Sequence, residues 1–218
     1  MDTPAHLDGG PPDGVPVVLL AHGAGVGMEA PLLQAIADGL AGAGCRVRRF
    51  EFPYMQRVRA TGRRRPPDPE RTLLQAWRDA ATQLRAETPA PLVVGGKSLG
   101  GRMASLVAEE LRAAGLLCLG YPFHPPGRPE RERTAHLSTL TVPTLILQGE
   151  RDAFGSRAEV AGYRLAPSIR IAWLPDGDHD FRPRRQSGVT LQDNYGTAVA
   201  EARAFCQSLA PPGMLRAP

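Results

Sequence analysis

The sequence has 218 residues, of which 42% are hydrophobic and 22% are charged. This length suits one domain with a large core, and the composition is that of a globular protein rather than a disordered or fibrous one. The longest apolar run near the start, residues 15–21, is much shorter than the ~20 residues that a helix needs to span a bilayer. No basic stretch followed by an apolar block opens the chain. We therefore expect a cytoplasmic protein with no membrane partner.

The net charge of +4 arises from 25 arginines and one lysine, Lys97, set against 22 acidic residues. Such a bias is as typical of the codon usage of a GC-rich genome as of an anionic partner. The three cysteines, Cys45, Cys118 and Cys206, are far apart and odd in number. They indicate neither a disulfide framework nor a metal site, so we expect neither a metal nor a cofactor.

Short apolar runs alternate with longer amphipathic segments along the chain, which predicts an α/β fold: a mostly parallel sheet of about six strands with helices on both faces. The predicted strands are Val15–Leu20, Val47–Phe52, Leu92–Val94, Leu116–Leu119, Thr144–Leu147 and Ile169–Leu174. The predicted helices are Glu29–Ala41, Glu70–Ala86, Leu99–Ala114, Ser156–Leu165 and Leu191–Leu209. Residues 1–14 are expected to be a flexible lead or a weak edge strand before a single domain over residues 15–218. Residues 53–69 are expected to be a long, arginine-rich loop.

The glycine-rich stretch around Ser98 fits one catalytic template better than another. A phosphate-binding loop, G-x-x-x-x-G-K-[ST], would require a glycine where Pro91 stands. The template G-x-S-x-G, between a strand and a helix, is met by Gly96-Lys97-Ser98-Leu99-Gly100. In that template the glycines clear space around a strained turn that exposes the serine. The spacing therefore favours Ser98 as a nucleophile.

A nucleophilic serine needs a base and a group that orients the base. Asp152 and His179 each follow a later predicted strand, in the chain order serine, acid, histidine that this elbow requires. The carboxyl ends of parallel strands meet at one edge of a sheet, so we predict that Ser98, Asp152 and His179 meet there. Taken alone, Asp152 is as typical of a turn or helix cap, and His179 of an acidic surface loop.

The other histidines fit the role of base less well. His6 lies in the lead, His136 in a loop or a short helix, and His124 precedes Asp152, which is the wrong order. An acyl-transfer site also needs backbone N–H donors for the oxyanion. We predict that Leu99, at the start of a helix, and Ala24, in the turn after the first strand, supply them. A glycine-rich turn with no catalytic part would look similar to the one around Ala24.

The motifs LAHGAG, GGKSLGGRMAS, GYPFHPPGRPE, PTLILQGERDAFG and DGDHDF together resemble the alpha/beta-hydrolase fold, in particular its small KANL/Tex-type branch near the dienelactone hydrolases. The resemblance extends from about Val15 onward. It implies a three-layer sandwich with Ser98 as nucleophile, His179 as base and Asp152 as its orienter. Dienelactone hydrolases carry cysteine where this chain has Ser98, and larger relatives insert a helical lid where this chain has only a loop of about twenty residues. We therefore expect an open site without a large lid.

These features predict a serine hydrolase that cleaves an ester-like bond in a small-molecule acyl substrate. Arg102, Tyr121 and His124 are candidate substrate-binding residues. The same sequence is also typical of a solvent-exposed arginine at position 102 and of a packed turn at positions 121–124. A noncatalytic interaction module with the same fold stays open as an alternative. Nucleic-acid binding through the arginine-rich loop has little support, because no aromatic residues alternate with those arginines. The sequence says nothing of the oligomeric state.

Overall fold

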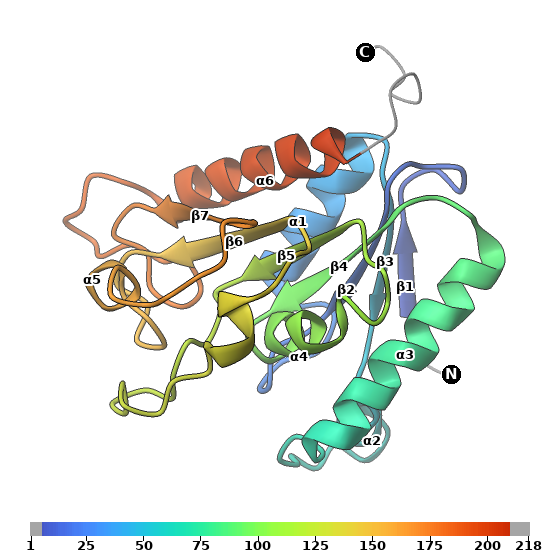
Figure 1. Cartoon of the computed structure of the whole chain (residues 1–218), viewed down its shortest axis with the longest axis horizontal. Coiled ribbons are helices and arrows are strands. Elements are labelled where there is room, and N and C mark those ends of the chain that lie inside the picture. The colour runs from blue at the N-terminus through green and yellow to red at the C-terminus, as the bar shows by residue number, and fades with distance from the viewer. Residues whose placement is uncertain (1–5, 210–218) are drawn as a thin grey trace.

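The computed structural model describes residues 6–209 and contains one seven-stranded sheet (Figure 1). The strand order is β1-β3-β2-β4-β5-β6-β7, and every neighbouring pair is parallel except β1 and β3. The strands are β1 (His6–Gly9), β2 (Val17–Ala21), β3 (Arg46–Phe50), β4 (Leu92–Lys97), β5 (Gly115–Leu119), β6 (Thr144–Gly149) and β7 (Ile169–Leu174). The predicted fold class is confirmed. The seventh strand, β1, pairs along the edge of β3 and is an edge strand, one of the two alternatives expected for residues 1–14; residues 1–5 of that segment lie outside the described residues.

Helices cover both faces of the sheet and make it the middle of three layers (Figure 1). The helices are α1 (Pro31–Gly42), α2 (Pro53–Thr61), α3 (Glu70–Glu87), α4 (Leu99–Val107), α5 (Arg157–Val160) and α6 (Leu191–Ser208). One face carries α1 and α6, which pack on each other, and the opposite face carries α3 and α4. Within residues 6–209, no helix is both long and apolar enough to cross a membrane.

The continuous apolar runs of the central strands follow from burial on both faces. In β2 every residue is buried: Val18 and Leu20 pack in the core beneath α1 and α6, whereas Leu19 packs in the core beneath α3 and α4. Successive side chains of a strand point to opposite faces, so a strand buried on both sides must be apolar at every position. This is why the sequence shows runs rather than alternation.

The segment predicted as a loop over residues 53–69 is helical in its first half, so that prediction is wrong. Pro53 stands in the first turn of α2, where its missing N–H costs nothing, and Gly62 closes the helix in a left-handed conformation with φ of 66°. Tyr54 and Met55 are buried against the sheet, which holds the helix in place despite its polar sequence.

Two predicted helices are shorter than expected. The helix predicted to end at Ala114 ends at Val107, and the chain then turns through Arg112, which has a φ of 47°. The helix predicted over Ser156–Leu165 is the single turn α5. A capping box between Ser156 and Glu159 starts that turn, but Gly162 follows one residue after its cap. Between β5 and β6 the chain forms only a short 3-10 helix, Ala135–Ser138, and no large lid.

An arginine fixes the edge strand to the rest of the molecule. Arg48 on β3 is 5% exposed and makes two hydrogen bonds to Asp8 of β1, of 2.6 and 2.7 Å, and two to Glu87 at the end of α3, of 2.6 and 3.0 Å. The Arg48 hydrogen bond holds the pKa of Asp8 below its usual range and lowers the pKa of Glu87 to about 2. Arg48 therefore links β1 and α3, two elements that are far apart in the sequence, through its position on β3.

Replacing Arg48 with glutamine should destabilise the protein at neutral pH by about 1–2 kcal/mol, a value already reduced because both carboxylates are partly exposed to solvent. A carboxyl whose pKa is lowered in the folded state stabilises fully above its unfolded value, which is 4.5 for Glu87, and loses that contribution as the pH falls toward 2. Urea unfolding should show the difference between wild type and Arg48→Gln shrinking from pH 7 to pH 3. Arg78→Gln, which removes the exposed pair Arg78–Glu110, should have a smaller effect at both values.

Candidate active site

The strand order changes direction between β2 and β4. From β2 the chain passes through α1 to β3 on one side, and from β3 it passes through α2 and α3 to β4 on the other side of β2. The helices that follow β2 and β4 consequently leave toward opposite faces of the sheet: α1 packs with α6, and α4 packs with α3. In open α/β sheets such a switch point leaves a crevice at the carboxyl ends of the strands.

Ser98 stands in a strained turn at that crevice. Its φ of 49° and ψ of −110° lie outside the regions that most residues adopt, and α4 begins at the next residue. The turn fits only because two neighbours lack side chains. A Cβ on Gly96 or on Gly100 would overlap the Ala21 carbonyl oxygen at the end of β2. The glycines are thus required by the close approach of the turn to β2.

A histidine and an aspartate are joined at the same edge. His179, in the loop after β7, and Asp152, in the loop after β6, form a 2.7 Å hydrogen bond between Nδ1 and Oδ2. Asp152 is fully buried, and the side chain of His179 is 22% exposed. A carboxylate accepts but does not donate, so the neutral imidazole carries its proton on Nδ1 and leaves Nε2 able to accept.

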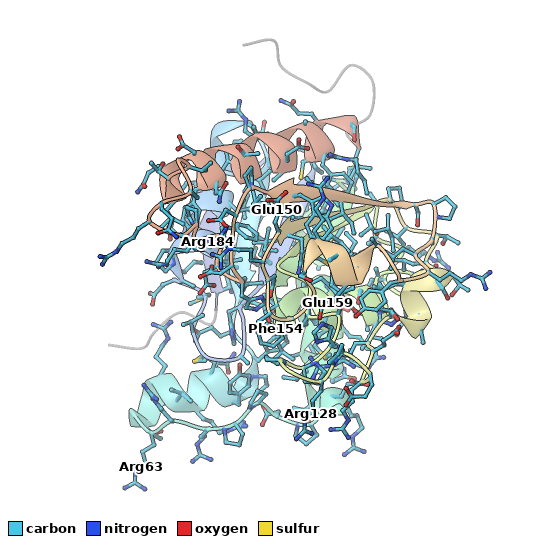
Figure 2. The ribbon with its side chains drawn as sticks, turned by 90° about the vertical axis from the view of Figure 1, so that its left-hand side faces the viewer. Arg63, Arg128, Glu150, Phe154, Glu159 and Arg184 are labelled. Atoms are coloured by element: carbon cyan, nitrogen blue, oxygen red, sulfur yellow. The ribbon has the colours of Figure 1, made fainter. Side chains whose placement is uncertain are left out.

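The carboxylate of Asp152 is held by two further donors. The side-chain amide of Gln148, at 0% exposure on β6, donates to Oδ2 at 2.9 Å, and the backbone N–H of Phe154 donates to Oδ1 at 2.8 Å. The ring of Phe154 lies against the ring of His179, with centroids 4.2 Å apart and planes inclined by 32°. Figure 2, which views the molecule from the side toward which β6 and β7 point, shows Phe154 near the middle of this surface. Phe154 thereby covers one face of the histidine.

The backbone brings Ser98 close to this pair. The N–H of Ser98 donates to the carbonyl of Leu119 at the end of β5, at 3.0 Å. The next residue, Gly120, lies against the His179 ring, because a Cβ built on it would be 3.2 Å from Nδ1. Ser98 and His179 therefore flank the same two residues. The loops after β6 and β7 also dock tightly, since a Cβ on Gly149 would overlap the carbonyl oxygen of Gly177 or Asp178.

The turn after β2, which contains Gly23 and Ala24, lies beside Ser98. A Cβ on Gly23 would be 3.8 Å from that of Ser98. His22, fully buried, braces the turn: its Nε2 accepts from the N–H of Phe52 at 3.1 Å and its Nδ1 lies 2.7 Å from the carbonyl oxygen of Gly23. Burial lowers the pKa of His22, which favours this neutral form. The hydroxyl of Tyr54 donates to the carbonyl of Ala24 at 3.0 Å.

The three candidate substrate-binding residues have protein partners. Arg102 pairs with Glu70 of α3 at 3.0 Å. Tyr121 is fully buried and donates its hydroxyl to the carbonyl of Arg133, and His124 is 2% exposed with Nδ1 2.8 Å from the carbonyl of Pro125. None of these contacts is with His179 or Asp152. A contact with substrate stays a prediction for each of them.

The competing histidines lie elsewhere. His6 is on the edge strand β1, and His136 contacts the buried hydroxyl of Ser105 on α4 at 2.8 Å. Sequence reasoning overlooked Gln148, Phe154 and Tyr54 as parts of the site. Phe154 follows Asp152 by two residues and Gln148 precedes it by four, but neither position carries a signal of its own without the fold.

Residues 14–207 match the alpha/beta hydrolase domain family, and the chain belongs to that family. Among solved structures it is similar to a serine hydrolase without a lid from Xanthomonas campestris, with 20% identity, a TM-score of 0.68, and coverage of 98% of this chain and 90% of that one. It is similar to the dienelactone hydrolase of Anabaena variabilis, with 20% identity, a TM-score of 0.69, and coverage of 94% and 92%. It is also similar to Est1E from Butyrivibrio proteoclasticus, with 16% identity, a TM-score of 0.66, and coverage of 94% and 93%. At these identities the structural likeness shows the fold.

The clearance of the Ser98 turn can be tested by adding single methyl groups. Gly96→Ala should destabilise the protein by about 3 kcal/mol or more, because its Cβ would overlap the backbone of β2 and because φ at this position is 148°. Gly196→Ala, in an exposed turn of α6 with nothing within 4 Å of the new Cβ, should stabilise it by about 0.5–1 kcal/mol. Thermal unfolding of both variants checks this. Equal stability of the two would contradict the packing described for the turn.

Proposed function

We propose that this protein is a serine hydrolase that cleaves an ester-like bond, in a carboxylester, thioester or lactone, with Ser98 as nucleophile, His179 as general base and Asp152 as the residue that orients the base. The observation that carries the proposal is the hydrogen bond of His179 to the buried carboxylate of Asp152. This pair lies against Gly120, and the preceding residue, Leu119, accepts a hydrogen bond from the N–H of Ser98. The strained backbone at Ser98 adds support, since such strain occurs at functional sites.

The reaction follows from these positions. The Nε2 atom of His179 takes the proton of Ser98 while Oγ attacks the substrate carbonyl carbon. The N–H groups of Leu99 and Ala24 hold the oxyanion that forms, and the positive end of the α4 dipole favours the same charge. His179 then returns the proton to the leaving alcohol or thiol, which departs as the C–O or C–S bond breaks. Water, deprotonated by His179, attacks the acyl-serine, and His179 returns that proton to Oγ as the bond between Oγ and the acyl carbon breaks and the acid leaves.

Two details of the structure support the proposed oxyanion donors. Leu99 is the first residue of α4, where backbone N–H groups have no partner within the helix. Ala24 lies in an exposed turn held from beneath by His22 and Tyr54, and this bracing would keep its N–H in place without reorganisation during the reaction.

We also propose that the chain belongs to the small KANL/Tex-type branch of the family. The motifs listed above support this placement, together with a serine at the elbow and a connection between β5 and β6 that holds no large lid. The short connection favours an open site.

Turnover of p-nitrophenyl esters of graded acyl length, with thioester and lactone substrates alongside, tests the proposal. Ser98→Ala and His179→Ala should each lower kcat/KM by at least about 10³-fold. The chain offers a matched control in its second serine–histidine contact: Ser105→Ala and His136→Ala should change activity by only a few fold, because Ser105 is 3% exposed and cannot meet a substrate. Full activity of Ser98→Ala would overturn the assignment.

A histidine base must be neutral to accept a proton, so kcat/KM should rise with pH on the acid side and level off once the imidazole is neutral. The pH dependence of p-nitrophenyl ester hydrolysis, measured under conditions where the protein stays folded, checks this expectation. A flat profile from pH 5 to pH 8 would contradict a histidine base.

A further inference from the structure

Lys97 is the single lysine of the sequence, and it directly precedes Ser98. It ends β4, and its side chain is only 6% exposed. The stem of the side chain passes Gly23, because a Cβ on Gly23 would be 3.4 Å from Cγ of Lys97. The ammonium group lies 3.4 Å from Oδ1 of Asp180, in the loop after β7. One side chain therefore contacts the turn after β2 and the loop that carries His179.

Burying an ammonium group is costly, and burial accordingly lowers the pKa of Lys97, against the opposing effect of Asp180 and Asp152. An apolar residue would fill the same space without that cost. A buried lysine at this position therefore calls for a role that needs its positive charge.

The charges around His179 indicate that role. Three carboxylates belong to these loops: Asp152 hydrogen-bonds to the ring of His179, and Asp178 and Asp180 are the residues on either side of His179 in the chain. Asp152, Asp178 and Asp180 all interact electrostatically with the Lys97 ammonium. The same loops also carry Glu150, which pairs with Arg157, Asp176, which pairs with Arg151 and Arg184, and the arginines Arg182 and Arg185. Tyr195 of α6 lies near Asp178 and Asp180. Lys97 is the ion-pair partner of Asp180, so its loss would leave the carboxylate next to His179 without that pair.

We propose that Lys97 is a positioning residue for the histidine base: its buried ammonium ties the loop of His179 to the end of β4 through Asp180, and its charge offsets the carboxylates of the two residues that flank His179. This inference rests on the proposed function, because it assumes that His179 acts as a base on Ser98. Lys97, which is next to the nucleophile Ser98 in the chain, would thus act on the position and charge environment of His179.

The test is the rate of labelling by a fluorophosphonate at Ser98, measured from pH 5 to pH 9 by intact mass. Lys97→Met keeps the length and the apolar contacts of the stem, and it should lower the labelling rate at pH 7 by at least tenfold. It should also move the midpoint of the pH profile upward by about one unit. Asp180→Asn removes a carboxylate instead, so it should move the midpoint downward, by about half a unit because Asp180 is 65% exposed.

Opposite shifts distinguish a charge effect from simple loss of packing, which would lower the rate without moving the midpoint in either direction. The same midpoints should appear in the ¹⁵N resonances of the His179 ring, assigned with His179→Gln, in a measurement that needs no turnover. Arg78→Met removes one positive charge from an exposed pair on α3 and should leave the rate and the midpoint unchanged. The double variant Lys97→Met/Asp180→Asn should be no slower than Lys97→Met alone, because the two residues act as a pair.

The two proposals can fail separately. If wild type is not labelled at Ser98, the serine-hydrolase proposal fails first. If wild type is labelled but Lys97→Met keeps at least half of its rate and the same midpoint, the role of Lys97 is overturned while the function stands. Should Lys97→Met not fold, the exposed position of Asp180 allows Asp180→Asn to decide: a downward shift of the midpoint supports the proposal, and an unchanged midpoint contradicts it.

Discussion

The site depends on one tight turn. To pass from β4 into α4 at Ser98, the backbone must run within contact distance of the carbonyl at the end of β2, and only glycines at positions 96 and 100 leave room for this. The same turn lets the N–H of Ser98 donate to the carbonyl of Leu119 at the end of β5. The serine is therefore fixed relative to β2, β4 and β5. A looser turn would bury the hydroxyl in the sheet or carry it away from the neighbouring loops. The strain at Ser98 is the cost of exposing it at a defined position.

Around this turn the site is assembled from loops that belong to four different strands. The loops after β6 and β7 are joined by the hydrogen bond between Asp152 and His179 and by the close contact of Gly149 with the backbone of residues 177–178. The turn after β2 is held from beneath by His22 and Tyr54. His179, Asp152 and the turn that contains Ala24 are thus each held by a buried partner, as preorganised sites require.

Much of this arrangement could be predicted from the sequence because its determinants are local. The glycine spacing around Ser98 indicates a turn that passes close to a neighbouring backbone, and the apolar runs indicate strands buried on both faces. The fold class and the order of the predicted site residues along the chain therefore followed from short stretches of sequence. The helix α2 could not be predicted, and the sequence left open whether residues 1–14 form an edge strand such as β1, because both elements depend on distant partners. β1 is held by pairing along β3 and by Arg48, and α2 is held by the burial of Tyr54 and Met55. The packing of Phe154 on His179 and the contact of Lys97 with Asp180 likewise join residues that are 25 or more positions apart.

The most direct test of the account is to react the purified protein with a fluorophosphonate and to locate the adduct by peptide mapping. The account predicts a single adduct on the peptide that contains Ser98, absent when Ser98 is replaced by alanine and strongly slowed when His179 is replaced. A folded protein that forms no adduct, or forms it on another serine such as Ser105, would contradict it. The fold would then be serving as a noncatalytic interaction module, and the search would turn from substrates to partners.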